Sequence, residues 1–312
     1  MRKTTMNYEK IVLVKKETQL EGLLKRHATT SQVKFYLESR GEKYDFYQSA
    51  HLAYLGGLHH ATQSILPEFR TQIVDKEHLD TFQFGDKDIV LVVGDPGLFV
   101  NVAKYVGTQP VICVNPDPQR YADTFTSCSI PQLPSVLRNI KEEKINLEYL
   151  TMAQAKLNDG QVLYALNDLF IGQKTHVSAR YSIEYQQKSE RQSSSGVIVS
   201  TGTGSTGWLT SIMTGAYGIA LGEQKGINEK CTFSREANYL QFAVREPFPS
   251  KVTGTTILEG KIDNSNPLKI TSNMPENGII FSDGIESDYL EFNAGAIATI
   301  QPAEKKVRLV KP

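Results

Sequence analysis

The stretch DIVLVVGDPGLFVNVAKYVGTQPVICVN, from Asp88 to Asn115, decides the fold of the chain. Its opening run, residues 88–95, is almost continuously apolar, which is typical of a parallel strand buried on both faces. Residues 98–107 then suit a helix, and the apolar run 110–115 predicts a second strand. A strand, a short helix and a strand in immediate succession form a βαβ unit, which requires a parallel sheet.

The residues before this stretch fit the same fold class. The run from Ile11 to Val14 is a short buried-strand signal. Residues 31–41 begin with a serine suited to an N-cap, carry apolar side chains at helical spacing and end with a glycine. We therefore expect residues 1–148 to form an α/β domain with a parallel sheet.

The periodicity of the sequence changes near residue 150. Residues 177–185 alternate strictly between apolar and polar side chains, which predicts a strand with one buried face. Further strands are expected at 239–246, at 267–272 and, with a turn at Ser282-Asp283-Gly284, at 278–292. The polar run 189–196 predicts a loop. We expect residues 149–312 to form a β-rich domain, whose last strand could return to the first domain.

Composition excludes several classes of protein. The chain of 312 residues carries 34 basic and 34 acidic residues, so its net charge favours neither nucleic acid nor membrane as a partner. Three widely separated cysteines argue against a disulfide framework and against a zinc site. The N-terminal apolar run is too short for a signal peptide, and no run is long enough to span a membrane. These features predict a cytoplasmic protein.

A glycine-rich stretch lies in the second half of the chain. Residues Gly202 to Gly207 match the dinucleotide-binding pattern G-x-G-x-x-G. The Rossmann interpretation needs a βαβ unit around the stretch, whereas this one lies among predicted antiparallel strands. Its small residues would still let the backbone approach a ligand, and its hydroxyl groups could donate or accept hydrogen bonds. A tight connection between a strand and a helix, without a ligand, is the alternative.

Two further segments are candidates for chemistry. Asp95 follows the predicted strand of the βαβ unit, where ligands of open α/β sheets collect, although Asp-Pro-Gly would also form a turn by itself. Asn167 and Asp168 interrupt an apolar run, and buried polar groups need hydrogen-bond partners. A ligand or a turn backbone could provide those partners equally well.

In this order, the three segments resemble the motifs GGDG, NE and TPTGSTAY of the NAD kinase family. The resemblance is closest to the mitochondrial-type branch of the family and extends over nearly the whole chain. The stretches that carry it are LLKRHATTSQV, VICVNPDPQR, ALNDLFIG, QSSSGVIVSTGTGS, FAVREPF and LEFNAGAIA. The resemblance implies an α/β nucleotide-binding domain followed by a β-rich NAD-binding domain.

The resemblance also implies an activity, the transfer of a phosphoryl group to the 2′-hydroxyl of the adenosine ribose of NAD. Asp95 would be the general base, and Gly94 and Gly97 would belong to the phosphate turn. Asn167 and Asp168 would hold the nucleoside of NAD. The nucleotide site would be lined by Thr203, Gly204, Ser205 and Thr206. The donor would be ATP or polyphosphate with Mg²⁺, no protein residue is expected as a metal ligand, and a homodimer is implied.

The sequence departs from the family pattern at the phosphate turn. Pro96 and Gly97 replace the Gly-Thr of the motif, which removes one backbone N–H and one hydroxyl group. Ser195 stands where many bacterial members carry an aspartate, and Trp208 replaces a tyrosine. Two alternatives therefore stay open, a relative that binds NAD, NADP or another nucleotide without kinase activity, and a related kinase with a lipid or sugar acceptor.

Overall fold

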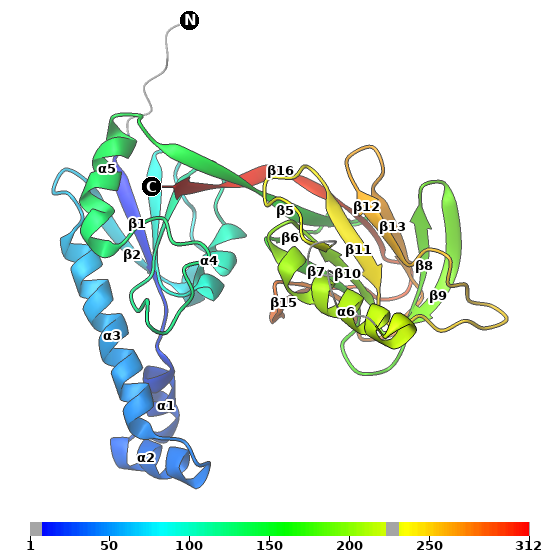
Figure 1. Cartoon of the computed structure of the whole chain (residues 1–312), viewed down its shortest axis with the longest axis horizontal. Coiled ribbons are helices and arrows are strands. Elements are labelled where there is room, and N and C mark those ends of the chain that lie inside the picture. The colour runs from blue at the N-terminus through cyan, green and yellow to red at the C-terminus, as the bar shows by residue number, and fades with distance from the viewer. Residues whose placement is uncertain (1–7, 223–230, 312) are drawn as a thin grey trace, which may run out of the picture. The chain divides into compact units, whose positions relative to one another are not determined.

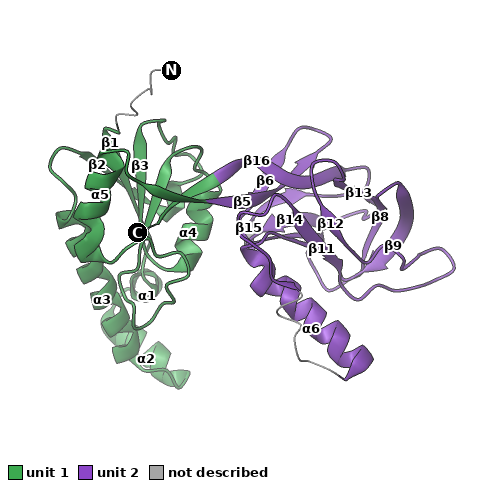
Figure 2. Cartoon of the chain, turned by 45° about the horizontal axis from the view of Figure 1, so that its top comes forward, with its two compact units in different colours: residues 1–148, 307–312 green, residues 149–306 purple. Residues whose placement is uncertain are grey.

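The computed structural model describes residues 8–222 and 231–311, and for residues 286 and 287 only the backbone. The chain divides into two compact units (Figure 2). Unit 1 comprises residues 1–148 and 307–312, and unit 2 comprises residues 149–306. Within the described ranges, no helix is long and apolar enough to cross a membrane.

Unit 1 is built on a parallel sheet. Its strands are β1 (Lys10–Lys15), β2 (Arg70–Asp75), β3 (Asp88–Val93) and β4 (Pro110–Val114), joined by the end of β16 (Ile297–Lys311). They are ordered β2-β1-β3-β4-β16, and each neighbouring pair in unit 1 is parallel. Every residue of β3 and β4 is buried. The predicted βαβ unit and the α/β fold class of this region are confirmed.

The strand order creates a switch point in the sheet. From β1 the chain proceeds to β2 on one side, and from β3 it proceeds to β4 on the other side. The carboxyl ends of β1 and β3 lie next to each other, because the two strands pair in register from Lys10 with Asp88 to Val14 with Val92. Ligands of open α/β sheets bind in the crevice outside the carboxyl ends of the strands at such a point.

In the described part of unit 1, five α-helices accompany this sheet. They are α1 (Gln19–His27), α2 (Thr30–Ser39), α3 (Tyr44–Gln63), α4 (Pro96–Ala103) and α5 (Leu133–Lys141), with short 3₁₀ turns η1 (Lys76–His78) and η2 (Ile130–Gln132). Figure 1 shows α1 and α2 at the beginning of α3, away from the sheet, where Leu20, Val33 and Leu37 form a separate core. The predicted helix at 31–41 is α2, and it begins one residue earlier because Thr29 provides the N-cap.

Unit 2 is formed by antiparallel strands. In chain order they are β5 (Asn146–Leu157), β6 (Val162–Ala165), β7 (Asp168–Gln173), β8 (Ala179–Tyr185), β9 (Lys188–Ser194), β10 (Val197–Ser200), β11 (Leu240–Val244), β12 (Glu259–Ile262), β13 (Leu268–Ser272), β14 (Gly278–Ser282) and β15 (Ile285–Glu291). One sheet has the order β12-β11-β10-β7-β14-β15. A second group contains β16-β13-β8-β9, with β5 paired to β6. The β-rich class predicted for this region is confirmed.

Alternate residues of both groups meet in one apolar core. Along β7, Leu169 and Ile171 point into it, and along β8, Tyr181 and Ile183 do. The opposite face of β7 carries Phe170, which packs with the helix α6 (Trp208–Leu221) through Trp208 and Ile212. The strand β7 therefore separates the core from an outer face that bears the polar and aromatic residues of interest.

The prediction of a loop at 189–196 is wrong. Residues 188–194 form β9, which pairs with β8 along its whole length. Its inward side chains are polar but buried. The Tyr181 hydroxyl donates to Gln192 Oε1 at 2.9 Å and lies 2.8 Å from Ser194 Oγ. These hydrogen bonds satisfy polar groups inside the core, so a polar sequence forms a strand there.

Candidate functional site

Asp95 lies at the carboxyl end of β3 and begins α4. Its Oδ1 accepts a hydrogen bond from the backbone N–H of Leu98 at 2.9 Å, and Pro96 occupies the first helical position. Proline is favourable there, since the N–H that it lacks would have no partner within the helix. Asp95 thus caps α4, and Pro96 suits its first position.

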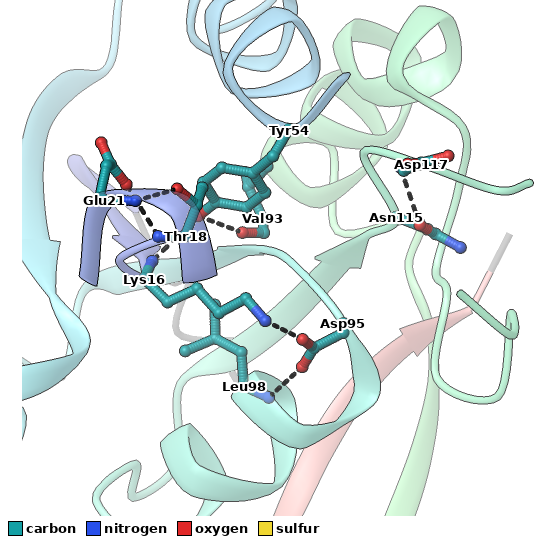
Figure 3. Close-up of polar contacts among 9 residues, drawn as sticks. All are labelled: Lys16, Thr18, Glu21, Tyr54, Val93, Asp95, Leu98, Asn115 and Asp117. Atoms are coloured by element: carbon teal, nitrogen blue, oxygen red, sulfur yellow. Dashed lines mark hydrogen bonds and ion pairs between the residues drawn. The ribbon is translucent and has the colours of Figure 1, made fainter. Parts of the chain in front are cut away.

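Lys16 forms an ion pair with the other oxygen of this carboxylate (Figure 3). It is the first residue after β1, and its ammonium group also lies 5.5 Å from the centre of the Tyr121 ring. The side chain of Lys16 is 24% exposed and that of Asp95 19%, so most of the pair is withdrawn from water. The sequence analysis missed Lys16, because only the pairing of β1 with β3 brings it next to Asp95.

Tyr54 on α3 joins the ends of the same two strands. Its hydroxyl accepts a hydrogen bond from the backbone N–H of Lys16 at 2.9 Å and donates to the carbonyl oxygen of Val93 at 3.2 Å (Figure 3). The residue is 3% exposed, and burial raises the pKa of its hydroxyl to about 12. The hydroxyl therefore stays protonated and keeps both contacts at physiological pH.

The two predicted glycines of the phosphate turn have packing roles in the structure. A Cβ on Gly94 would lie 2.7 Å from Leu98 Cδ2, and one on Gly97 would lie 3.2 Å from Asp95 Oδ1. The backbone N–H of Gly94 donates to the carbonyl oxygen of Val114 at 3.1 Å. A Cβ on Gly94 would press on the Leu98 side chain at the start of α4, and a role of either glycine in binding phosphate stays a prediction.

A polar turn follows the neighbouring strand β4. Asn115 Oδ1 accepts a hydrogen bond from the backbone N–H of Asp117 at 3.0 Å (Figure 3), and its amide nitrogen donates to Asp123 Oδ1 at 2.9 Å. The turn touches α3 at Gly57, where a Cβ would lie 2.5 Å from Pro116. The segment VICVNPDPQR of the family resemblance is therefore held at the same edge of the sheet as Lys16 and Asp95.

In unit 2, Asn167 and Asp168 form the turn that leads into β7. The carboxylate of Asp283 accepts three backbone N–H groups of this turn, from Leu166 at 3.1 Å, Asn167 at 2.7 Å and Asp168 at 3.2 Å. The N–H of Asp283 donates back to the carbonyl oxygen of Asp168 at 2.9 Å. The sequence indicated a turn at Asp283 but not that its side chain holds another turn.

The Asp168 carboxyl lies in a low-dielectric environment. Burial raises its pKa to about 7, against a hydrogen bond with Ser200 that lowers it, and the nearby charge of Asp283 raises it further. Its Oδ1 is buried without a hydrogen-bond partner among the described residues, as are Thr203 Oγ1 and Ser282 Oγ. Buried polar atoms in native proteins nearly always have partners, so a ligand or a water molecule could complete these groups.

The glycine-rich stretch lies against this turn. A Cβ on Gly204 would lie 2.4 Å from the carbonyl oxygen of Asn167 and 2.8 Å from Asp168 Oδ1, so only glycine permits the approach. Thr201 Oγ1 donates to the carbonyl oxygen of Leu166 and accepts from the N–H groups of Thr203 and Gly204 at 3.1 and 3.2 Å. The sequence thus brings Thr203 and Gly204 to the Asn167–Asp168 turn.

The other two predicted residues of the stretch point elsewhere. Ser205 is fully buried, and its hydroxyl donates to the carbonyl oxygen of Gly202 at 2.8 Å. Thr206 is exposed at the end of the 3₁₀ turn η3 (Gly204–Thr206). The strand before the turn, β10, is antiparallel to both of its neighbours, so the stretch is not the loop of a Rossmann βαβ unit.

An aromatic cavity of about 430 Å³ opens on the outer face of unit 2. The rings of Phe170, Trp208 and Phe281 stack on one another there, with centroids 4.8 to 6.4 Å apart. Ser195 lines the cavity, and the guanidinium of Arg245 lies 5.5 Å from the Trp208 ring. Phe170 is two residues after Asp168, and side chains two residues apart in a strand share a face.

The described residues around Asp95 in unit 1 and around Asp168 in unit 2 form no cluster of potential metal ligands. Throughout residues 8–222 and 231–311, no group of three or more His, Cys, Asp and Glu side chains is arranged to hold a metal ion. Both oxygens of Asp95 already have partners in the protein.

Comparison with known proteins shows the fold. No protein-family model and no curated protein matches the sequence. Yeast NADH kinase in complex with NADH superposes with a TM-score of 0.56 at 13% identity, over 98% of this chain and 84% of that chain. An NAD kinase from Archaeoglobus fulgidus in complex with ATP gives 0.56 at 15% identity, over 97% and 93%. The chain has an NAD kinase-like fold.

Proposed function

We propose that the protein is an NAD kinase that phosphorylates the 2′-hydroxyl of the adenosine ribose of NAD to give NADP. The observation that carries the proposal is a pair of buried atoms beside the Asn167 turn, Asp168 Oδ1 and Thr203 Oγ1, which have no hydrogen-bond partner among the described residues. In a fold shared with an NADH kinase bound to NADH and an NAD kinase bound to ATP, a nucleoside is the ligand that best completes them.

The proposed reaction assigns one role to each group. The 2′-hydroxyl oxygen attacks the terminal phosphorus of the donor, the bond from that phosphorus to the bridging oxygen breaks, and ADP or a shortened polyphosphate leaves. Asp95 accepts the hydroxyl proton as general base. Asn167, Asp168, Thr203 and Gly204 hold the nucleoside, while Gly94 and Gly97 belong to the phosphate turn. Mg²⁺, bound with the donor, would neutralise phosphate charge.

A second candidate, an NAD(P)- or nucleotide-binding protein without kinase activity, is favoured by one observation. Asp95 caps α4 with one oxygen and pairs with Lys16 through the other, so the proposed base is engaged on both sides. The stacked rings of Phe170 and Trp208 would serve a binding protein as well as an enzyme. The membership of the mitochondrial-type branch, a homodimer and a cytoplasmic location stay predictions from the sequence.

The decisive experiment measures NADP formation by the purified protein from NAD or NADH, with Mg²⁺ and either ATP or polyphosphate. Thermal unfolding with NAD, NADP or ATP is measured on the same preparation, because a ligand that binds only the folded state raises the Tm. NADP formation that depends on the donor supports the kinase. Stabilisation by NAD without turnover supports the binding protein, and no response to NAD or NADP rejects both proposals.

A further inference from the structure

Lys16 and Asp95 mark the switch point of the parallel sheet in unit 1. One follows β1 and the other follows β3, and their side chains form an ion pair across the ends of the two strands (Figure 3). In sheets of this kind, ligands bind outside the carboxyl ends of the strands at the switch point. An ammonium group there is suited to a polyanion, whereas a carboxylate alone would repel one.

The backbone around Asp95 has few donors left for phosphate. Pro96 has no N–H, the N–H of Gly94 is bonded to the carbonyl oxygen of Val114, and that of Leu98 is bonded to Asp95 Oδ1. A glycine-rich phosphate turn binds its ligand through several such N–H groups. A phosphate chain at this place can use fewer of these N–H groups, so a cationic side chain becomes more important for binding it.

We propose that Lys16 binds the phosphate chain of the donor, ATP or inorganic polyphosphate, by transferring its ammonium group from Asp95 to the phosphate oxygens. The inference rests on the proposed function, and it names a binding residue that the family motifs do not contain. The exchange has a second effect, since it frees Asp95 Oδ2 to accept the hydroxyl proton. Donor binding and exposure of the general base thus become one event.

The surroundings of Lys16 suit this exchange. Its backbone is fixed by the Tyr54 hydroxyl, which in turn is fixed on Val93, so the base of the side chain is held between the two strands. Its long flexible stem can redirect the ammonium group, which three donors equip for several phosphate oxygens. The Tyr121 ring, 5.5 Å from the ammonium group, stabilises the cation where it now lies.

The test measures the binding of tripolyphosphate and ATP to the full-length protein by calorimetry, for wild type, Lys16→Met and Lys16→Arg. A hydrogen bond to a charged group contributes about 1.5 to 3 kcal/mol, so Lys16→Met is expected to weaken donor binding about 10- to 100-fold. Lys16→Arg should regain at least part of the affinity. NAD affinity should change by less than about twofold in both.

Lys15→Met is the matched control. Lys15 is the neighbouring residue on β1, and it pairs with Asp75 at 2.5 Å on the other side of the strand. Lys15→Met removes one positive charge, as Lys16→Met does, but it should leave the affinity for the donor within about twofold of wild type. Lys16→Met leaves the Asp95 carboxylate unpaired, which could lower the Tm. The double variant Lys16→Met with Asp95→Asn removes that unpaired charge, and its donor affinity should remain as low as that of Lys16→Met.

The outcomes separate this inference from the proposed function. Donor binding to Lys16→Met within twofold of wild type, or equal losses in Lys15→Met, would overturn the inference. Wild-type protein that binds no tripolyphosphate and no ATP would overturn it too. If Lys16→Met loses donor binding while the wild-type protein makes no NADP, the phosphate site is supported and the kinase activity is rejected.

Discussion

Asp283 accepts a hydrogen bond from the backbone N–H of Asn167 at 2.7 Å, although the two residues are 116 positions apart in the sequence. The same carboxylate takes two further N–H groups of that turn. The polar turn that begins β7 is therefore shaped by the turn after β14. The conformation of Asn167 and Asp168 depends on a residue outside every family motif of the sequence.

Asp283→Asn is expected to lower the free energy of unfolding by about 2 to 4 kcal/mol, because an amide replaces a charged acceptor of three N–H groups. Asp283 has φ +57°, which asparagine also tolerates, so the substitution tests the hydrogen bonds rather than the backbone. Urea unfolding and NAD titration measure the effect, and NAD should bind at least about tenfold more weakly. Wild-type stability and affinity in this variant would show that the carboxylate does not hold the turn.

Asp168 predicts a dependence of stability on pH. Burial raises the pKa of its carboxyl to about 7 in the folded protein, so the folded state binds a proton more tightly than the unfolded state does. The contribution of this group to stability is therefore present at about pH 4 and is lost as the pH rises toward 7. An asparagine at position 168 carries no charge at any pH, so Asp168→Asn avoids the cost of burying a carboxylate. At pH 8 the variant should be more stable than wild type by on the order of 2 to 4 kcal/mol.

Urea unfolding of both proteins between pH 4 and pH 8 is the measurement. The two curves should meet near pH 4 and separate as the pH rises. A difference between the proteins that stays constant over this range would mean that Asp168 does not titrate there.

Asp95→Asn separates the two tasks of this residue. The amide oxygen can still cap α4, as asparagine is a good N-cap, but it cannot accept the hydroxyl proton. Turnover is expected to fall about 10²- to 10⁴-fold, while NAD affinity stays within about twofold. Asp95→Ala, which also removes the cap, should lower stability by a further ~1 kcal/mol. A variant Asp95→Asn that turns over like wild type would exclude Asp95 as the base.

Tyr54→Phe removes the hydroxyl group that forms hydrogen bonds at the carboxyl ends of both β1 and β3. The backbone N–H of Lys16 loses its acceptor and the carbonyl oxygen of Val93 loses a donor, at a cost of about 1 to 3 kcal/mol. Tyr121→Phe is the control, because it keeps the ring near the Lys16 ammonium. Thermal unfolding should rank Tyr54→Phe clearly below the control. Equal Tm values for the two variants would show that the Tyr54 hydroxyl does not join the strands energetically.

Gly204→Ala tests the contact between the glycine-rich stretch and the Asn167 turn. The new methyl group would lie 2.4 Å from a backbone oxygen, so the two segments must separate and NAD binding should be lost. Gly215→Ala in α6 is the matched control, since its Cβ would meet nothing within 4 Å. Alanine favours a helix by about 0.5 to 1 kcal/mol over glycine, so this control should be as stable as wild type or more so. Normal NAD binding by Gly204→Ala would dismiss the contact as a requirement for the site.

Local patterns predicted the elements of the fold well. The continuous apolar run at β3 and the alternation at β8 each identify a strand and its environment, because both depend on neighbours in sequence. The polar strand β9 was missed, since its buried Gln192 and Ser194 are satisfied by Tyr181 on another strand. No local pattern contains that information.

The sequence singled out only some residues of the candidate site, because local patterns do not show contacts between distant parts of the chain. Motifs singled out Asp95, Asn167 and Asp168. Asp95 follows β3, as the sequence predicted, and Asn167 and Asp168 lie at the turn into β7, while their roles stay predictions. Lys16 and Asp283 were not singled out, because their importance comes from strand order and from a contact across the chain. A lysine after a strand or an aspartate in a turn is common, so neither has a signal of its own.

The last strand has a consequence for how the chain is made. β16 first pairs with β13 in unit 2, and its end then lies beside β4 as part of unit 1. During synthesis, the ribosome must therefore complete all of unit 2 before the sheet of unit 1 receives its last member. Until then β4 is an open edge, which is where nascent chains are most prone to pair wrongly. If the first half folds early, its sheet therefore lacks its last strand until the end of β16 has been made.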